Sequence, residues 1–323
     1  MEPGDPGRGD RAAVIDAAIV GLGRWGRSLV ESVQGKSASI RFVLGVEPER
    51  GATPGFKLVS SFDAALGDRS VQALVLATPH SLHLPQVLAA AAAGKPVFCE
   101  KPLALTLADA RRMVDACERA GIVLGVGHNR RWWPAMRELA RLVGLGELGT
   151  LLHIEGHNSN ENSNAVAGGW RTLAAESPGG GMTGAGLHAL DAMVAIAGPV
   201  REVKARLIER KPPPAPHDTV SALLEFESGV SGLLATVRAT PFYWRVHAFG
   251  TRGNAEVLGE TELLLRMSGA RPERRSFAAV DSLRAELEAF ADAVEHRAPF
   301  PIAPAQMLET VAAFERVVRA LDA

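Results

Sequence analysis

The sequence predicts an α/β protein in which an N-terminal doubly wound parallel sheet is followed by an α+β domain with a mostly antiparallel open sheet. Its 323 residues are more than one hydrophobic core usually organises, so two domains are expected. Up to about residue 132, short and continuously apolar runs alternate with helical stretches, as in a parallel sheet covered on both faces. Beyond that point several runs alternate apolar and polar residues between tight-turn sequences, which is typical of antiparallel strands.

The first domain is expected to span residues 14–132. Helices are predicted over 82–93 and 107–120, the second with Thr106 as its N-cap. Residues 1–13 are polar and contain no apolar core segment, so a disordered leader is expected there. The predicted strands are the apolar runs 17–21, 40–47, 71–78, 96–100 and 122–127.

The second domain, residues 133–323, is expected to bind the substrate and to form the oligomer. It begins with a predicted helix over 136–143, continues with several alternating strands and ends in two helices. The alternation leaves a second sheet face for a partner subunit, so a homodimer or homotetramer is expected. The closing helices carry apolar residues at helical spacing, namely Leu283, Leu287, Phe290 and Val294, then Met307, Val311, Phe314, Val318 and Leu321.

The overall composition excludes several classes of partner. Lysine and arginine number 35 against 36 aspartates and glutamates, and the net charge of −1 predicts no binding to nucleic acid or to an acidic membrane. No apolar run is long enough to cross a membrane. Cys99 and Cys117 lie in apolar surroundings without metal-ligand spacing, which predicts no metal site and a reducing, cytoplasmic location.

A glycine-rich turn follows the first predicted strand and opens a helix. Gly21 is expected to make the tight turn, Gly23 to let a pyrophosphate approach backbone amides, and Gly26 to permit close packing of helix on strand. Arg24 and Trp25 lie between these glycines and are expected to contact the same ligand. The alternative is a turn of this kind with no ligand. The context favours a dinucleotide-binding site in the motif Gly21-Leu22-Gly23-Arg24-Trp25-Gly26.

An acidic residue ends the second predicted strand. Glu47 comes 21 residues after Gly26, where its carboxylate would accept hydrogen bonds from the adenosine ribose hydroxyls and repel a 2′-phosphate. NAD is therefore the predicted cofactor. Arg24 and Arg50 are nearby cations that keep NADP as the minority alternative.

Polar residues follow the next two predicted strands at their carboxyl ends, where ligands bind in open α/β sheets. Thr78, Pro79 and His83 are expected to border the cofactor, although His83 fits a surface histidine at the start of a helix equally well. Glu100 and Lys101 are expected to lie beside the nicotinamide. A lysine there can act as a general acid or base if burial and a cationic nicotinamide lower its pKa. An exposed Glu-Lys pair before a turn is the alternative.

In their order, these segments resemble the Gfo/Idh/MocA family of sugar and polyol oxidoreductases over about residues 14–320. The resemblance implies a Rossmann domain that carries NAD(P) and a C-terminal domain whose open sheet often forms the oligomer interface. It also implies that Lys101 and His188 face the substrate carbon beside the nicotinamide. It rests on the segments VGLGRWG, Glu47, LATPHSLHLPQVLAAAAAGKPVFCEKPLALT, GVGHNRRWWP, GELGTLLHIEG, GGGMTGAGLHALD and AFGTRGNAEV.

The stretch GGGMTGAGLHALD, residues 179–191, is expected to lead into the helix that carries His188 and Asp191. These two residues are three apart and share a helical face, so Asp191 is expected to orient His188 or to bind a substrate hydroxyl. A capping or surface aspartate is the alternative. Many catalytic members of the family carry an aspartate four residues before the histidine, where this chain has Gly184. That departure leaves the proton path, the substrate class and redox turnover open.

The remaining candidate substrate residues are Arg130, Trp170 and Arg171. The Trp170-Arg171 pair offers an aromatic face for a sugar ring and a planar fork for a carboxylate or a hydroxyl pair. The amide-rich segment 157–164 also suits a polyhydroxylated ligand, but a solvated loop is the favoured interpretation.

The predicted function is an NAD-dependent dehydrogenase or reductase. It would transfer hydride between the nicotinamide and a secondary alcohol or ketone of a sugar, cyclitol or related hydroxylated small molecule. One alternative is a non-catalytic NAD-binding sensor or regulator on the same fold. The other is an NAD-dependent glycosidase.

Overall fold

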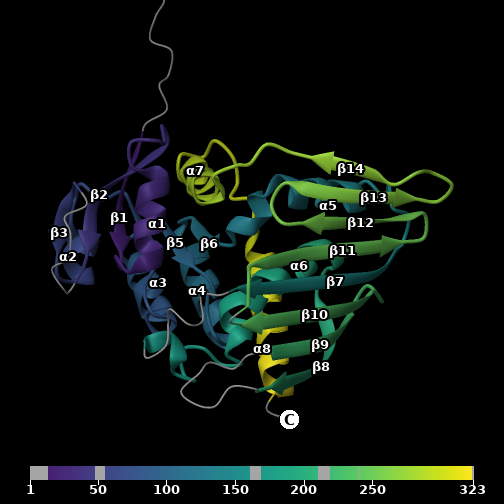
Figure 1. Ribbon diagram of the computed structural model, residues 1–323. Coiled ribbons are helices and arrows are strands. Elements are labelled where there is room, and N and C mark those ends of the chain that lie inside the picture. Colours follow the sequence, from purple (N-terminus) through teal and green to yellow (C-terminus); the bar gives the residue numbers. More distant parts are fainter. Residues whose placement is uncertain (1–13, 48–54, 161–168, 210–218, 239, 322–323) are drawn as a thin grey trace, which may run out of the picture.

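The molecule is built on two β-sheets, one in each half of the chain (Figure 1). The leader expected at 1–13 lies outside the part of the chain that the structure describes, as do Arg50 and the second half of the amide-rich segment. The computed structural model describes residues 14–47, 55–160, 169–209, 219–238 and 240–321.

The first sheet is six-stranded and parallel, with the order β3-β2-β1-β4-β5-β6. This order confirms the predicted doubly wound domain. The chain adds β2 and β3 on one side of β1 and the later strands on the other side, from β4 onward. In this class of sheet, ligands bind in the crevice at the point where the strand order changes side, here between β1 and β4. The strands are β1 (Ile15–Val20), β2 (Ile40–Val46), β3 (Lys57–Val59), β4 (Ala73–Leu76), β5 (Val97–Glu100) and β6 (Leu124–Gly127).

Helices cover both faces of this sheet, and local signals in the sequence set their ends. Helix α4 (Leu107–Ala120) has the predicted bounds because Thr106 accepts a hydrogen bond from the Asp109 amide at 3.1 Å, and Gly121 ends it with φ of 65°. The other helices of this half are α1 (Arg24–Val33), α2 (Phe62–Gly67) and α3 (His83–Ala92).

The second sheet has eight strands in the order β14-β13-β12-β11-β7-β10-β9-β8. The pair β7–β10 is parallel and the other neighbours are antiparallel, so the prediction of a mostly antiparallel sheet is confirmed. The strands are β7 (Leu151–Asn160), β8 (Val200–Ile208), β9 (Thr219–Phe226), β10 (Ser231–Arg238), β11 (Tyr243–Gly250), β12 (Gly253–Leu258), β13 (Glu262–Met267) and β14 (Glu273–Ser276).

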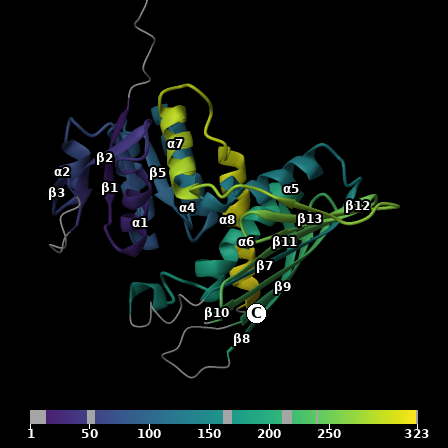
Figure 2. The ribbon, with the colours of Figure 1, turned by 45° about the horizontal axis from the view of Figure 1, so that its top comes forward.

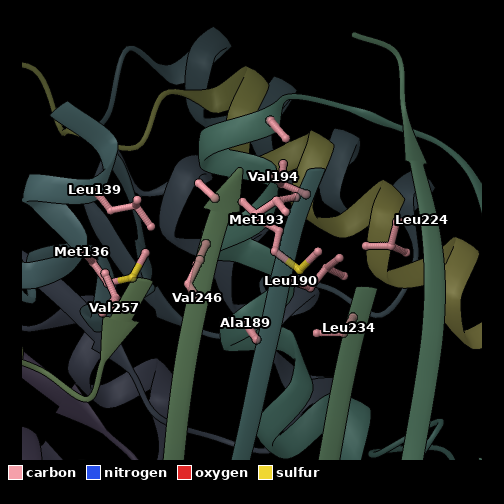
Figure 3. Packing of buried hydrophobic residues seen from close by; sticks show 14 of the residues in the cluster. Met136, Leu139, Ala189, Leu190, Met193, Val194, Leu224, Leu234, Val246 and Val257 are labelled. Atoms are coloured by element: carbon pink, nitrogen blue, oxygen red, sulfur yellow. The ribbon is translucent and has the colours of Figure 1, made fainter. Parts of the chain in front are cut away.

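Two helices, α5 (Pro134–Gly144) and α6 (Leu187–Ala197), pack their apolar sides on one face of the second sheet. Figure 3 shows Met193 of α6 pointing onto the strands between its neighbours Leu190 and Val194. Strand glycines make room for it, since a Cβ at Gly156 would lie 2.6 Å from the Met193 sulfur. This close approach seats the helix that carries His188 against β7.

The last two helices join the halves of the molecule (Figure 2). Helix α7 (Ser282–Val294) packs on the first sheet, where Phe290 meets Phe98 with ring centroids 5.7 Å apart. Helix α8 (Pro304–Leu321) contacts α4 of the first half and α6 of the second. No helix among the described residues is long and apolar enough to cross a membrane.

Candidate active site

The glycine-rich turn between β1 and α1 has the geometry of an anion site. Gly21 has φ of 94°, and a Cβ on Gly26 would lie 1.9 Å from the Gly21 carbonyl oxygen, so both positions require glycine. A Cβ on Gly23 would meet nothing within 4 Å. Gly23 is also the N-cap of α1, with no side-chain cap and no acid in the first turn. The free amides of this helix end therefore fit a dinucleotide pyrophosphate.

A cleft opens at the carboxyl ends of β4 and β5 and extends to the start of α6. It encloses about 1000 Å³, counting its open mouth. The structure brings eight of the predicted residues together in its lining: Arg24, Trp25, Thr78, Glu100, Lys101, Arg130, Arg171 and His188.

Lys101 lies at the end of β5 and faces the segment before α6. Its Nζ donates a hydrogen bond to the Gly184 carbonyl oxygen at 2.8 Å. Burial lowers the pKa of Lys101, the carboxylate of Glu100 opposes this, and Arg130, Arg171 and Arg24 lower it further. A lysine with a lowered pKa provides neutral amine near neutral pH, which is the form that acts as a base.

His188 lines the same cleft from the first turn of α6. Burial lowers the pKa of its imidazole well below the ordinary value, and the nearby charges of Lys101 and Arg130 lower it further. The ring is therefore neutral. Its Nδ1 is buried and has no hydrogen-bond partner among the described residues. An unpaired buried nitrogen is unfavourable until a ligand group pairs with it.

Glu100 is buried beneath the cleft. Burial raises the pKa of its carboxyl to about 7, and the Lys101 amide donates to Oε2 at 3.2 Å. Gly127 on β6 leaves room for it, because a Cβ there would lie 2.7 Å from the carboxylate. Glu100 therefore fixes the backbone at Lys101 through this hydrogen bond.

His83 does not line the cleft. Its ring is fully buried, with Nδ1 2.9 Å from the Pro102 carbonyl oxygen and Nε2 3.2 Å from that of Thr78. It ties together the loops that follow β4 and β5, which is a structural role, and its contact with the cofactor stays a prediction. The histidine of the LATPHSLH segment that lines the cleft is His80.

His80 joins the two halves of the molecule at the cleft mouth. Its Nδ1 lies at hydrogen-bond distance from the Glu176 carbonyl oxygen, and the Glu176 carboxylate accepts from the Ser81 amide at 3.1 Å. The Trp170 ring meets His80 edge-on at 4.9 Å. Trp170 thus lies behind the cleft, where it supports Arg171 at 4.1 Å from its ring. Arg171 is in the lining and Trp170 is not.

Asp191 also lies outside the cleft lining. Its carboxylate is buried and accepts from Arg131 Nε and Nη2 at 2.9 and 2.7 Å and from Thr310 Oγ1 at 3.1 Å. Although Asp191 and His188 share a helix, no hydrogen bond joins them among the described residues. The carboxylate is held by Arg131 and Thr310 and faces His128 Nε2 at 3.6 Å, so it does not orient His188 through a hydrogen bond; its contact with a substrate hydroxyl stays a prediction.

Two further expectations concern strand ends. Glu47 follows β2 and is half-buried, with its amide donating to the Val59 carbonyl oxygen at 3.1 Å; its ribose contact stays a prediction, as does the cofactor contact of Pro79. The amide-rich segment is not all loop, because β7 continues to Asn160. The buried Asn158 donates to the Ala185 carbonyl oxygen at 2.6 Å, which holds the segment before α6 in place.

Gly184 lies in one turn of π-helix, Met182–Gly186, that runs directly into α6. A Cβ at Gly184 would meet no atom within 4 Å. The absence of a side chain is therefore not required by packing. Single π-helical turns are frequent at functional sites, and here the turn exposes the carbonyl that holds Lys101.

The comparisons with known proteins agree with this geometry. The family model for the NAD-binding Rossmann fold of Gfo/Idh/MocA oxidoreductases matches residues 15–128, and the model for the Gfo/Idh/MocA C-terminal domain matches residues 136–256. The chain belongs to the Gfo/Idh/MocA oxidoreductase family. This confirms the resemblance, and the first half of the chain matches the NAD-binding Rossmann fold of that family.

Curated relatives share part of their length with the chain. The 2,7-anhydro-N-acetylneuraminate hydratase of Escherichia coli (strain K12) is 29% identical over 270 residues, which are 79% of this chain and 71% of the relative. The 1,5-anhydro-D-fructose reductase of Ensifer adhaerens is 37% identical over 126 residues, 38% of each protein. The chain covers between 38% and 71% of the lengths of the first such relatives.

Solved structures share the fold over nearly the whole chain. The aldose-aldose oxidoreductase from Caulobacter crescentus, complexed with glycerol, matches 96% of this chain and 98% of that one with a TM-score of 0.84 and 23% identity. At this identity the likeness shows the fold alone.

Proposed function

We propose that the protein is an NAD-dependent dehydrogenase or reductase acting on a secondary alcohol or ketone of a sugar, cyclitol or related hydroxylated compound. The observation that carries the proposal is the Lys101 amine, whose pKa burial lowers, in one cleft with the neutral imidazole of His188. The relative named a reductase of a 1,5-anhydro sugar supports the substrate class.

The residues of the cleft would have separate roles in the oxidation of an alcohol. The glycine-rich turn would hold NAD, which would supply the hydride acceptor. The neutral amine of Lys101 takes the proton of the substrate hydroxyl, and His188 orients that hydroxyl through its unpaired ring nitrogen. The Gly184 carbonyl aims the amine and accepts a hydrogen bond from the ammonium that forms. In reduction the same ammonium returns the proton.

The direct test is incubation of the purified protein with NAD and a panel of sugars, polyols and cyclitols. NADH absorbance reports net oxidation. Exchange of substrate hydrogen with a deuterated cofactor reports transient oxidation, as in the glycosidase alternative, and the hydratase among the relatives makes this second readout necessary. A protein that binds NADH yet shows neither signal with any compound would be the sensor of the alternative interpretation.

The first prediction concerns the choice of cofactor. We expect NADH to bind about tenfold or more tightly than NADPH, because Glu47 would accept the ribose hydroxyls and repel a 2′-phosphate. Titration calorimetry measures both affinities. Glu47→Gln keeps the shape of the side chain and removes its charge, so it should reduce the ratio between the affinities for NADH and NADPH. Equal or inverted affinities in the unmodified protein would contradict the prediction.

A second prediction concerns Gly184. Because nothing occupies the space of its Cβ, Gly184→Asp should fold normally and place a carboxylate near the Lys101 ammonium. An opposite charge raises the pKa of a lysine, so the rising limb of the pH–rate profile for oxidation should move up by about one unit or more. Gly184→Asn is the matched control without charge. Identical profiles for the two variants would show that Lys101 is not the titrating base.

A third prediction concerns assembly. The outer face of the second sheet exposes Leu223 and Leu233, which lie opposite each other on β9 and β10 and are 49% and 47% exposed. We propose that this face meets a partner subunit. Light scattering at micromolar concentration should show a dimer or tetramer, and Leu223→Asp should weaken the association of the subunits. Leu145→Asp, at another exposed leucine, should not. A strict monomer would refute the proposal.

A further inference from the structure

The cleft has a large excess of positive charge. Among the described residues its lining contains four arginines in addition to Lys101, and Glu100 is the single carboxylate; the arginines are Arg24, Arg130, Arg171 and Arg238. Both lining histidines are neutral at physiological pH, because burial lowers the pKa of His80 to about 3 and that of His188 well below its ordinary value. A neutral sugar would leave most of this charge unpaired.

Arg130 is the clearest unpaired cation. The Trp244 and Trp133 rings lie 4.4 and 5.0 Å from its central guanidinium carbon, so aromatic faces stabilise it. Aromatic faces leave the in-plane N–H groups unsatisfied, and Nη1 is buried without a hydrogen-bond partner. No carboxylate of the described residues forms an ion pair with it. A buried arginine in this state is unfavourable unless a ligand accepts its hydrogen bonds.

Arg238 faces the same cleft from the second sheet. It is the last residue of β10 and pairs in register with Asn160 of β7, which also lines the cleft. It is half-buried, burial lowers its pKa, and no carboxylate within the described ranges forms an ion pair with it. Sequence analysis did not identify Arg238 as a candidate, because the parallel pairing of β10 with β7, two strands far apart in the chain, is what brings it to the cleft.

The cofactor does not account for these two arginines. Arg24 is the first residue of α1, at the helix end that fits the pyrophosphate, and its charge also acts on Arg171. Arg130 comes from the turn that follows β6 and Arg238 from the end of β10, so neither belongs to the glycine-rich turn, and both line the cleft together with Lys101 and His188.

We propose that Arg130 and Arg238 bind an acidic group, a carboxylate or a phosphate, on the hydroxylated substrate. The substrate is then a sugar acid or a sugar phosphate rather than a neutral sugar. This assignment rests on the proposed function for the position of the reacting carbon, whereas the anion site itself rests on the unpaired cations. Charge-assisted bonds from two arginine forks should favour the acid over its neutral counterpart by about 10- to 100-fold.

The test is titration calorimetry on the protein saturated with NADH. Matched probes are D-glucose, D-glucuronate and D-glucose 6-phosphate, and the corresponding galactose series, with the uronates and phosphates separating the two kinds of acid. We expect at least one acid to bind tenfold or more tightly than its neutral partner. Arg238→Met should abolish that preference and leave the affinity for NADH unchanged, and Arg130→Lys should reduce it. Arg206→Met, at an exposed position of β8, is the control.

Equal affinity for acids and neutral sugars, or binding of no acid at all, would overturn the assignment. So would a preference that survives in both Arg238→Met and Arg130→Lys. These outcomes are distinguishable from failure of the proposed function. Efficient NADH formation from neutral sugars would refute the proposed anion site and support the proposed dehydrogenase activity. Selective binding of an acid without any hydride transfer would support the proposed anion site and refute the proposed dehydrogenase activity.

Discussion

Replacing Lys101 with methionine should lower kcat by roughly 10²–10⁴ while leaving the affinity for NADH nearly intact, because a positioned acid–base group contributes about that much. Methionine keeps the length and the apolar stem of lysine and removes the amine that donates to the Gly184 carbonyl. Stopped-flow measurement of NADH formation on the best substrate of the panel gives kcat, and cofactor fluorescence gives the binding constant.

Lys57→Met is the matched control, since Lys57 is an exposed lysine of the same domain whose partner is the surface residue Asp68. His188→Asn distinguishes two roles for the imidazole. A loss mainly in kcat would indicate proton transfer, and a rise mainly in KM would indicate that the ring only holds substrate. Unchanged kinetics in both Lys101→Met and His188→Asn would place the chemistry elsewhere.

Replacing Arg131 with methionine should destabilise the folded protein by about 3–5 kcal/mol, because it removes the guanidinium from the buried Asp191 carboxylate. Thr310 Oγ1 at 3.1 Å and His128 Nε2 at 3.6 Å would be the polar groups that remain beside that carboxylate. Asp191 is 2% exposed and joins three elements: Arg131 comes from the turn before α5, and Thr310 comes from α8. The thermal midpoint should fall by on the order of 10 °C, as measured by calorimetry or circular dichroism.

The dependence on pH gives a second readout. Although burial opposes it, the charge of Arg131 holds the pKa of Asp191 below its ordinary value in the folded protein. The stabilisation is therefore complete above the ordinary aspartate pKa and is lost as the pH falls through the lower folded value. The difference between Arg131→Met and the unmodified protein should persist at neutral pH and shrink in acid.

Arg112→Met is the control for this effect. Arg112 pairs with Asp109 on the exposed side of α4, and exposed pairs contribute little. If Arg131→Met has the same thermal midpoint as the unmodified protein, the buried pair is not what joins α6 to the turn before α5. If Arg112→Met melts as early as Arg131→Met, loss of an arginine in general would explain the result.

Local chemistry made much of the fold predictable. Thr106 and Gly121 bound α4 because a side-chain cap and a left-handed residue act over a few positions, and the run 96–100 anticipated a strand because a doubly covered strand is apolar throughout. Strand β3 has three residues and too little pattern to be found, so it appears only through its pairing with β2.

The candidate site was predictable where a residue lies beside a glycine-rich turn or a strand end. Arg24, Thr78 and Lys101 are of this kind, and all three line the cleft. His83 and His80 illustrate the limit, because both occur three residues apart in one polar segment and the sequence does not say which ring turns inward. The fold buries His83 between two backbone carbonyls and leaves His80 in the cleft.

By itself the sequence determined the parallel and the mostly antiparallel sheet, the glycine-rich turn after β1 and the lysine at the end of β5, because these depend on periodicity and on residues close together in the chain. Only the tertiary structure decided what the distant charges do. It paired Asp191 with Arg131, 60 positions away, and brought Arg130 and Arg238 to one cleft, where no carboxylate of the described residues forms an ion pair with either. The reason is that ion pairing depends on distance in space and on burial, which depend on how the two sheets and their helices pack.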